Sequence, residues 1–248
     1  MKKLLGILVA LMLVLGFAGQ SMATFADLEV LRVIYDATTS TEYAVDLGKI
    51  GVGSLAIGGS GAFSATNQNL GGAFTLASGV LGSGASVSDT LKVAYMAVDQ
   101  TVGQMWLSGT TAIRPYNTGN DSNYAAMTGM YAYYGAANSN ASKSMTADAH
   151  SYWIGMNSTG SAVGSFDSFF LNGAGSEAAF TYGQTPSLNL YYYADPYTAG
   201  HNGFNMGTLQ VQADGSTVLN PSAVPIPGAV WLLGSGLLGL IGVRRRNA

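Results

Sequence analysis

The side chains that carry acid–base or nucleophilic chemistry are scarce in this sequence. It has two histidines, His150 and His201, and no cysteine. A Ser-His-Asp triad needs one of these histidines beside a serine and a carboxylate, but residues 24–222 contain no Gly-x-Ser-x-Gly motif to present the serine. Asp148 and His150 stand in a polar stretch, and His201 stands in a turn-like Gly-His-Asn-Gly segment. We therefore predict no catalytic residue and no enzymatic activity.

Carboxylates offer a second route to hydrolysis, because glycosidases use two acids held at a fixed separation. The 13 acidic residues include no pair that the sequence singles out. The absence of cysteine excludes disulfides, thiolate nucleophiles and cysteine–zinc sites. A carbohydrate-cleaving domain stays an alternative without assigned residues.

Oxygen ligands for a cation gather in the segment Asn117–Asn123, whose sequence is NTGNDSN. The spacing does not match an EF-hand, which requires alternating acids, a glycine at the sixth position and a terminal glutamate. Asx-rich turns explain such a composition without a metal. We predict no cofactor and no metal site, with a bound Ca²⁺ in this segment as the alternative.

Two tyrosine runs, residues 131–134 and 191–193, accompany Trp106 and Trp153 and offer a stacking surface for sugars. If the first run is a strand, alternation puts Tyr131 and Tyr133 on one face and Tyr134 on the other. Aromatic residues also simply suit strands, and this alternative stays open. The candidate ligand contacts are Tyr131, Tyr133, Tyr191 and Tyr193.

The elements that position these residues are predicted to be strands. Apolar and polar residues alternate with a period of two around residues 28–35, 43–47, 91–98 and 188–192. Leu209 and Val211 alternate with glutamines before Asp214-Gly215, a dipeptide that favours a tight turn, and Thr217–Leu219 supplies the return strand of a hairpin.

Glycine-rich connectors such as residues 58–61, 71–72 and 82–84 separate these strands at a spacing typical of a sandwich or jelly roll. Helical patterns are scarce, and Ala136–Ala149 is expected to be a long loop. The predicted fold class is all-β, a single antiparallel β-sandwich or jelly-roll-like domain. This body covers residues 24–222, with its strands between Phe25 and Leu219.

The N-terminus has the three parts of a secretory signal peptide. Lys2 and Lys3 precede an apolar stretch from Leu4 to Ala18, and Ser21-Met22-Ala23 supplies a small-residue exit. We predict that residues 1–23 are removed after Ala23. An uncleaved N-terminal anchor is the alternative.

The C-terminus combines a proline motif, an uncharged apolar run and an arginine cluster. Gly228–Val243 spans about 24 Å as a helix, slightly less than a hydrocarbon core of about 30 Å. Pro225 and Pro227 disfavour helix before them, so the helix is expected to begin near Gly228. The positive-inside rule keeps the arginines cytoplasmic and places the body outside the cytoplasm.

This tail, residues 223–248, closely resembles the VPLPA-type C-terminal sorting signal of the PEP-CTERM class. In that family the tail is recognised by exosortase, a membrane cysteine transpeptidase of Gram-negative bacteria that cleaves near the proline motif and is associated with exopolysaccharide production. Ile226 and Gly228 stand where Leu and Ala are usual, which leaves the cleavage position open. An ordinary single-span anchor is the alternative. The resemblance implies a sorting and cleavage motif at Val224, Pro225, Ile226 and Pro227, and a membrane stop at Arg244, Arg245 and Arg246.

Charge limits the partners of the body. All 13 acidic residues but only five of the ten basic ones lie in residues 24–222, a formal charge of −8. Such a surface repels nucleic acids and gains little from an acidic polymer.

The resemblance and the composition together predict an exported protein of a Gram-negative bacterium. It would be an inner-membrane intermediate with a transient span, and then a protein of the cell surface or the extracellular space. Its expected partners are signal peptidase, exosortase and an extracellular polysaccharide, and not nucleic acid. We expect a non-enzymatic structural or adhesive component linked to exopolysaccharide or biofilm; the alternative is a secreted carbohydrate-binding or carbohydrate-cleaving domain.

Overall fold

The structure, a computed structural model, describes residues 27–109, 121–135, 140–144, 151–152, 177–194 and 203–222. Ten strands, one α-helix and two short 3-10 helices lie in these ranges. The strands are β1 (Glu29–Asp36), β2 (Thr41–Lys49), β3 (Gln68–Gly71), β4 (Leu91–Asp99), β5 (Gln104–Gly109), β6 (Asn140–Ser144), β7 (Ala178–Phe180), β8 (Ser187–Tyr193), β9 (Phe204–Val211) and β10 (Thr217–Leu219). The helices are α2 (Asp121–Gly135), η1 (Gly53–Leu55) and η2 (Leu76–Ser78).

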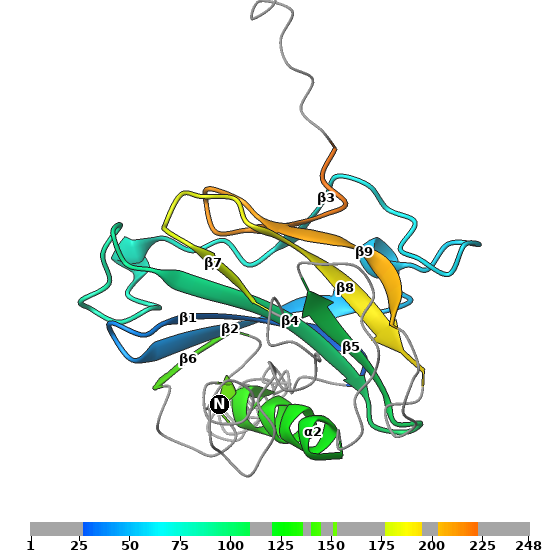
Figure 1. Cartoon of the computed structure of the whole chain (residues 1–248). Helices are drawn as coiled ribbons and strands as arrows, with labels where there is room; N and C mark the ends of the chain where they lie inside the picture. The colour runs from blue at the N-terminus through cyan, green and yellow to red at the C-terminus, as the bar shows by residue number, and fades with distance from the viewer. Residues whose placement is uncertain are drawn as a thin grey trace, which may run out of the picture.

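The described strands form one antiparallel sheet in the order β3-β10-β9-β8-β5-β4-β1-β2-β6, and β7 pairs with β4 (Figure 1). The prediction of an all-β antiparallel fold is confirmed. All four strands predicted from alternation are present, as β1, β2, β4 and β8. The sheet curls on itself: Gly72, which follows β3, lies so close to Val45 of β2 that an added Cβ would approach its Cγ1 within 2.9 Å.

The predicted hairpin is confirmed, with β9 paired to β10 across the Asp214-Gly215 turn. Gly215 has a φ of +79°, which an L side chain rarely adopts. A Cβ there would also approach the Phe74 ring within 2.4 Å. The Asp214 carboxylate accepts hydrogen bonds from the backbone amide and hydroxyl of Ser216. These bonds lower the pKa of Asp214 below its usual value.

The sheet buries side chains on both of its faces. The inner face of the curl is filled by Val30, Ile34, Tyr95, Leu190 and other apolar side chains from strands and from the 50–90 segment. The outer face carries Leu31, Val33, Met96 and Leu107, which pack against helix α2 and Tyr152. Because β1 and β4 are covered on both faces, they contain nearly continuous apolar runs.

Helix α2 lies against this outer face, below the sheet in Figure 1. Met127, Met130, Tyr131 and Tyr134 are buried at spacings of three and four residues, which is the pattern of one helical face. Residues 131–134 are therefore helical, and the strand alternation considered for Tyr131, Tyr133 and Tyr134 does not apply to them. Among the described residues, no helix combines the length and the apolar character needed to cross a bilayer.

The predicted loop Ala136–Ala149 is also partly wrong, because it contains strand β6. β6 pairs with β2 from Thr41↔Ser144 to Val45↔Asn140. Its sequence, NASKS, has no strand pattern of its own. The open edge of β2 supplies the hydrogen bonds that make it a strand.

Candidate functional site

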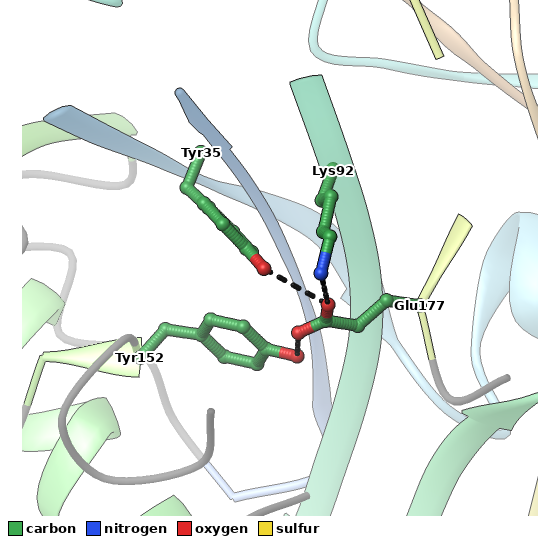
Figure 2. Close-up of polar contacts among 4 residues, drawn as sticks. All are labelled: Tyr35, Lys92, Tyr152 and Glu177. Carbon is green, nitrogen blue, oxygen red and sulfur yellow. Dashed lines mark hydrogen bonds and ion pairs between the residues drawn. The ribbon is translucent and has the colours of Figure 1, made fainter. Parts of the chain in front are cut away.

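The most polar cluster of the described residues surrounds the carboxylate of Glu177, just before β7. Tyr35 of β1 donates from its hydroxyl to Oε2 at 2.9 Å, and Tyr152 donates to Oε1 at 2.5 Å. The Nζ atom of Lys92, from β4, lies 3.3 Å from Oε2. Figure 2 shows the three side chains converging on this one carboxylate. Both carboxylate oxygens thus accept a hydroxyl, and one also faces a cation.

Burial distinguishes the partners in this cluster. The side chain of Glu177 is 7 % exposed, whereas that of Lys92 is 42 % exposed. Lys92 also lies over the Tyr35 ring, 5.8 Å from its centroid. A buried carboxylate depends on its hydrogen bonds, while an exposed ammonium remains solvated. The two hydroxyl donors therefore hold Glu177 more than the lysine does.

A second buried carboxylate, that of Glu42 in β2, joins the same layer. Tyr134 of α2 donates to Glu42 Oε1 at 2.6 Å. The backbone amide of Tyr152 lies 2.9 Å from the Tyr134 hydroxyl oxygen and 3.3 Å from the same Oε1. Burial, reinforced by the Glu42 charge, raises the pKa of Tyr134 well above its usual value, so that this hydroxyl stays a donor. Tyr152 thus connects both carboxylates through one residue.

Tyr131 fixes α2 to the sheet. Its hydroxyl accepts from the backbone amide of Val98 at 3.0 Å and donates to the carbonyl of Glu29. Burial raises the pKa of Tyr131 above its ordinary value. These contacts join α2 to β1 and β4, so the buried Tyr131 stabilises the packing of the helix on the sheet.

The buried cation Arg32 lies on the opposite, inner face of the sheet. From β1 it donates to the carbonyl oxygens of Gly215 and Gly72, both at 2.6 Å, and to Thr217 Oγ1 at 2.8 Å. Burial lowers the pKa of its guanidinium, and the nearby Tyr95, Tyr43 and Asp214 oppose this change. Arg32 therefore connects β1 with the β9–β10 hairpin and with the end of β3.

The structure does not bring the four predicted aromatic contacts into an exposed row. Tyr131, Tyr191 and Tyr193 are buried in the layer between the sheet and α2, and Tyr133 of α2 is only partly buried against it. These buried positions leave no open ring face at Tyr131, Tyr191 or Tyr193 on which a sugar could stack.

A different aromatic row lies across β5, β8 and β9. Trp106 pairs with Tyr192, and Tyr192 pairs with Phe204, so three rings share one face of three neighbouring strands. The Trp106 and Tyr192 ring centroids are 4.9 Å apart. Trp106 is 4 % exposed and Phe204 is 43 % exposed. The row therefore runs from the core to the surface.

A pocket of about 210 Å³ opens beside this row. Its lining combines rings, aliphatic groups and one amide: Ile57, Gly61, Gln104, Trp106, Tyr192 and Met206. The loop that contains Ile57 and Gly61 is held on β9 by a hydrogen bond from the Phe63 amide to the Met206 carbonyl, at 2.8 Å. Rings, aliphatic groups and an amide thus meet at one hollow of the described surface.

Sequence reasoning noticed Trp106 and the run 191–193 but selected Tyr191 and Tyr193, which do not line the pocket. Within β8, Leu188, Leu190 and Tyr192 share the face that carries the pocket, and Tyr191 and Tyr193 point to the other. The alternation Leu188-Leu190-Tyr192 was visible in the sequence. Phe204 carried no signal, because only the pairing of β8 with β9 places it beside Tyr192.

The remaining predicted sites lie wholly or largely outside the described residues. These are the proline motif Val224–Pro227, the arginines Arg244–Arg246, both histidines and the first residues of Asn117–Asn123. Asp121, which belongs to the segment considered as the alternative Ca²⁺ site, begins helix α2. Within the described ranges, no three His, Asp or Glu side chains gather in a way that would hold a metal ion.

Comparison with protein-family models, with curated proteins and with solved structures finds no match to this chain.

Proposed function

We propose that this chain is an exported protein of the cell surface or extracellular matrix that exosortase processes at its C-terminus. The observation that carries the proposal is the tail: a proline motif at Val224–Pro227, an uncharged run over Gly228–Val243 and three arginines in that order. As a helix the run measures about 24 Å, slightly less than a hydrocarbon core of about 30 Å, and the arginines favour the cytoplasmic side. In this proposal the span is temporary and ends when the proline motif is cut.

The position of the last strand supports such processing. β10 ends at Leu219, and the described residues continue to Ser222, two residues before the motif begins. A cut near Val224–Pro227 would leave β10 and its pairing with β9 and β3 intact. We further propose that the curled sheet is a sandwich-like or jelly-roll-like domain, flanked by a signal peptide and the sorting helix.

We propose a structural or adhesive role for the body in an exopolysaccharide matrix or biofilm, and three of its charged groups serve to hold the fold together. Arg32, Glu42 and Glu177 each have partners that hold segments of the fold together. These interactions join the β9–β10 hairpin, α2 and the segment at Tyr152 to strands β1 and β2. We propose that their task is a stable exported body and that the protein performs no catalysis.

Fractionation of cells with and without exosortase tests the proposal. With the enzyme, the protein should leave the inner membrane; without it, the protein should stay there. The double substitution Pro225→Ala with Pro227→Ala should trap the protein in the membrane, since the extended proline segment is lost. Pro221→Ala, just outside the motif, is the matched control and should be exported normally. Equal export of all variants with and without exosortase would contradict the proposal.

A second candidate function is a secreted carbohydrate-binding or carbohydrate-cleaving domain. The observation that favours the binding form is the pocket beside Trp106, Tyr192 and Phe204. The two candidates are compatible, because an exported matrix protein can also bind a glycan.

A further inference from the structure

We propose that the pocket beside Trp106, Tyr192 and Phe204 binds one sugar ring of a neutral glycan chain. The inference rests on the second candidate function, carbohydrate binding, and is independent of how the tail is processed. It assigns the contacts to Trp106, Tyr192, Phe204 and Gln104, none of which belongs to the four tyrosines predicted from the sequence.

The ring faces are the first argument. Sugar rings carry C–H bonds whose positive ends suit the negative face of an aromatic ring. The accessible ring area belongs to Tyr192, which is partly buried, and to Phe204 on the next strand, which is 43 % exposed. Trp106 is 4 % exposed; it lines the pocket and packs against Tyr192, with ring centroids 4.9 Å apart and planes tilted by 33°. Gly61 lines the pocket and lies beside the Phe204 ring: a Cβ atom added at Gly61 would be 3.6 Å from that ring. The pocket and the exposed ring are therefore parts of one continuous surface.

Polar groups at the lining are the second argument. Among the described residues, neither the Gln104 side-chain amide nor the Tyr192 hydroxyl has a hydrogen-bond partner. Burial and the nearby Asp99 raise the pKa of Tyr192, so its hydroxyl keeps its proton and can donate. An amide and a phenol can satisfy sugar hydroxyls, which an apolar occupant would leave without partners.

Size and charge decide which glycan fits. A volume of about 210 Å³ lies below the ~300–1,000 Å³ of pockets for larger ligands, and so suits a single ring. The exposed Phe204 leaves room for the chain to continue along the surface. The body carries 13 acidic and five basic residues, so an acidic glycan would be repelled. A neutral hexose polymer fits the volume of the pocket, the open surface beside Phe204 and the negative charge of the body.

Isothermal titration calorimetry tests the inference, with protein purified from cells that express the full-length chain. The probes are cellohexaose and laminarihexaose, which are neutral, and hexagalacturonate, which is acidic. At least one neutral probe should bind, and hexagalacturonate should not. Phe204→Ala should raise the Kd of the neutral probe roughly fivefold to tenfold, and Phe204→Tyr should restore it. Gln104→Ala should raise it about threefold or more, since one hydrogen bond is lost.

Val87→Ala is the matched control, because Val87 is an exposed apolar residue outside the pocket lining. Its Kd should equal that of the unchanged protein. The Trp106 indole signal in an ¹⁵N-tryptophan NMR spectrum should shift on titration, and comparison with Trp106→Phe identifies that signal.

Two outcomes would overturn the inference in different ways. If a neutral probe binds with the same Kd to the Phe204→Ala and Gln104→Ala proteins, carbohydrate binding stands and the assigned site is wrong. If none of the three probes binds, or only the acidic one does, the neutral-glycan inference fails, and with no binding at all the second candidate function fails with it. Neither outcome bears on export.

Discussion

The Arg32 guanidinium lies 2.6 Å from the carbonyl oxygen of Gly215, although 183 residues separate the two in the chain. Arg32 belongs to β1, the third strand from the β6 end of the strand order, and Gly215 belongs to the β9–β10 turn, near the opposite end. This contact spans the interior of the curled sheet. A buried cation therefore holds together strands that do not pair with one another.

Arg32→Ala should lower the free energy of unfolding by roughly 3–5 kcal/mol, because it opens a cavity and leaves two buried oxygens, of Gly215 and Thr217, and the partly buried carbonyl of Gly72 without their donor. Arg32→Lys should lose less, since one ammonium can reach some but not all of them. Urea unfolding followed by circular dichroism measures both. Lys49→Ala, at an exposed position, is the control and should stay within about 0.5 kcal/mol of the unchanged protein. A loss below about 1 kcal/mol for Arg32→Ala would contradict the bridging role.

Glu177→Gln should destabilise the protein more than Lys92→Ala. The carboxylate accepts two hydroxyl hydrogen bonds and is nearly buried, so its replacement should cost about 1.5–3 kcal/mol. Lys92 is substantially exposed, and its loss should cost less than about 1 kcal/mol. Chemical denaturation of the two variants provides the comparison. The reverse ranking would mean that the ion pair, and not the two tyrosines, holds this cluster.

Two tyrosine-to-phenylalanine substitutions should have opposite consequences. Tyr134→Phe removes a hydroxyl that donates to Glu42 and accepts from Tyr152, and should cost about 1–3 kcal/mol. The Tyr95 hydroxyl is buried close to Thr217 but makes no hydrogen bond of good geometry among the described residues, so Tyr95→Phe should be neutral or stabilising. Melting temperatures distinguish the two cases. Equal losses would show that the Tyr95 hydroxyl also has a stabilising partner.

Stability should fall at alkaline pH. Burial raises the pKa of Tyr95 to about 12, and the pKa values of Tyr131 and Tyr134 are raised as well. The unfolded chain releases these protons near pH 10, so above that pH it binds fewer protons than the folded state, and folding weakens. The stability that depends on these protonated hydroxyls is fully present below about pH 10 and is lost as the pH rises towards 12.

Urea unfolding at about pH 9 and about pH 11 measures this dependence, with up to about 1.4 kcal/mol lost per pH unit for each such tyrosine. Tyr95→Phe should remove one of these contributions and make the slope shallower. Phenolate absorbance near 295 nm should show these tyrosines ionising only as the protein unfolds. A stability that is constant from pH 9 to 11 would contradict the burial of these hydroxyls.

The strands that were predicted correctly are those whose own residues show an apolar or alternating pattern. The hairpin at Asp214-Gly215 combines alternation with a turn dipeptide, and Leu91–Asp99 is apolar apart from Lys92 and its last residue, Asp99. β6 could not be predicted, since its residues favour no strand and the edge of β2 recruits them. Helix α2 did carry a signal, the spacing of Met127, Met130, Tyr131 and Tyr134, but the tyrosine run was interpreted with a period of two.

The aromatic pocket shows a different limit of sequence reasoning. Tyr192 was accessible through the alternation of β8, yet the neighbouring tyrosines were preferred because three in succession leave the choice of face ambiguous. Its partners Trp106 and Phe204 come from strands 86 residues before and 12 residues after it, and only the register of β5, β8 and β9 unites them. Local sequence patterns do not predict which distant strands pair in this way.

Intact-mass analysis of the exported protein tests the central claim, that the chain is delivered by a removable C-terminal sorting signal. The account predicts a species from wild-type cells that begins at about Thr24 and lacks Trp231–Ala248, with its C-terminus near Val224–Pro227. Cells without exosortase should retain the complete tail in their membrane fraction. Full-length tail in wild-type membranes, with no truncated form outside the cell, would contradict the account and leave an ordinary single-span anchor in its place.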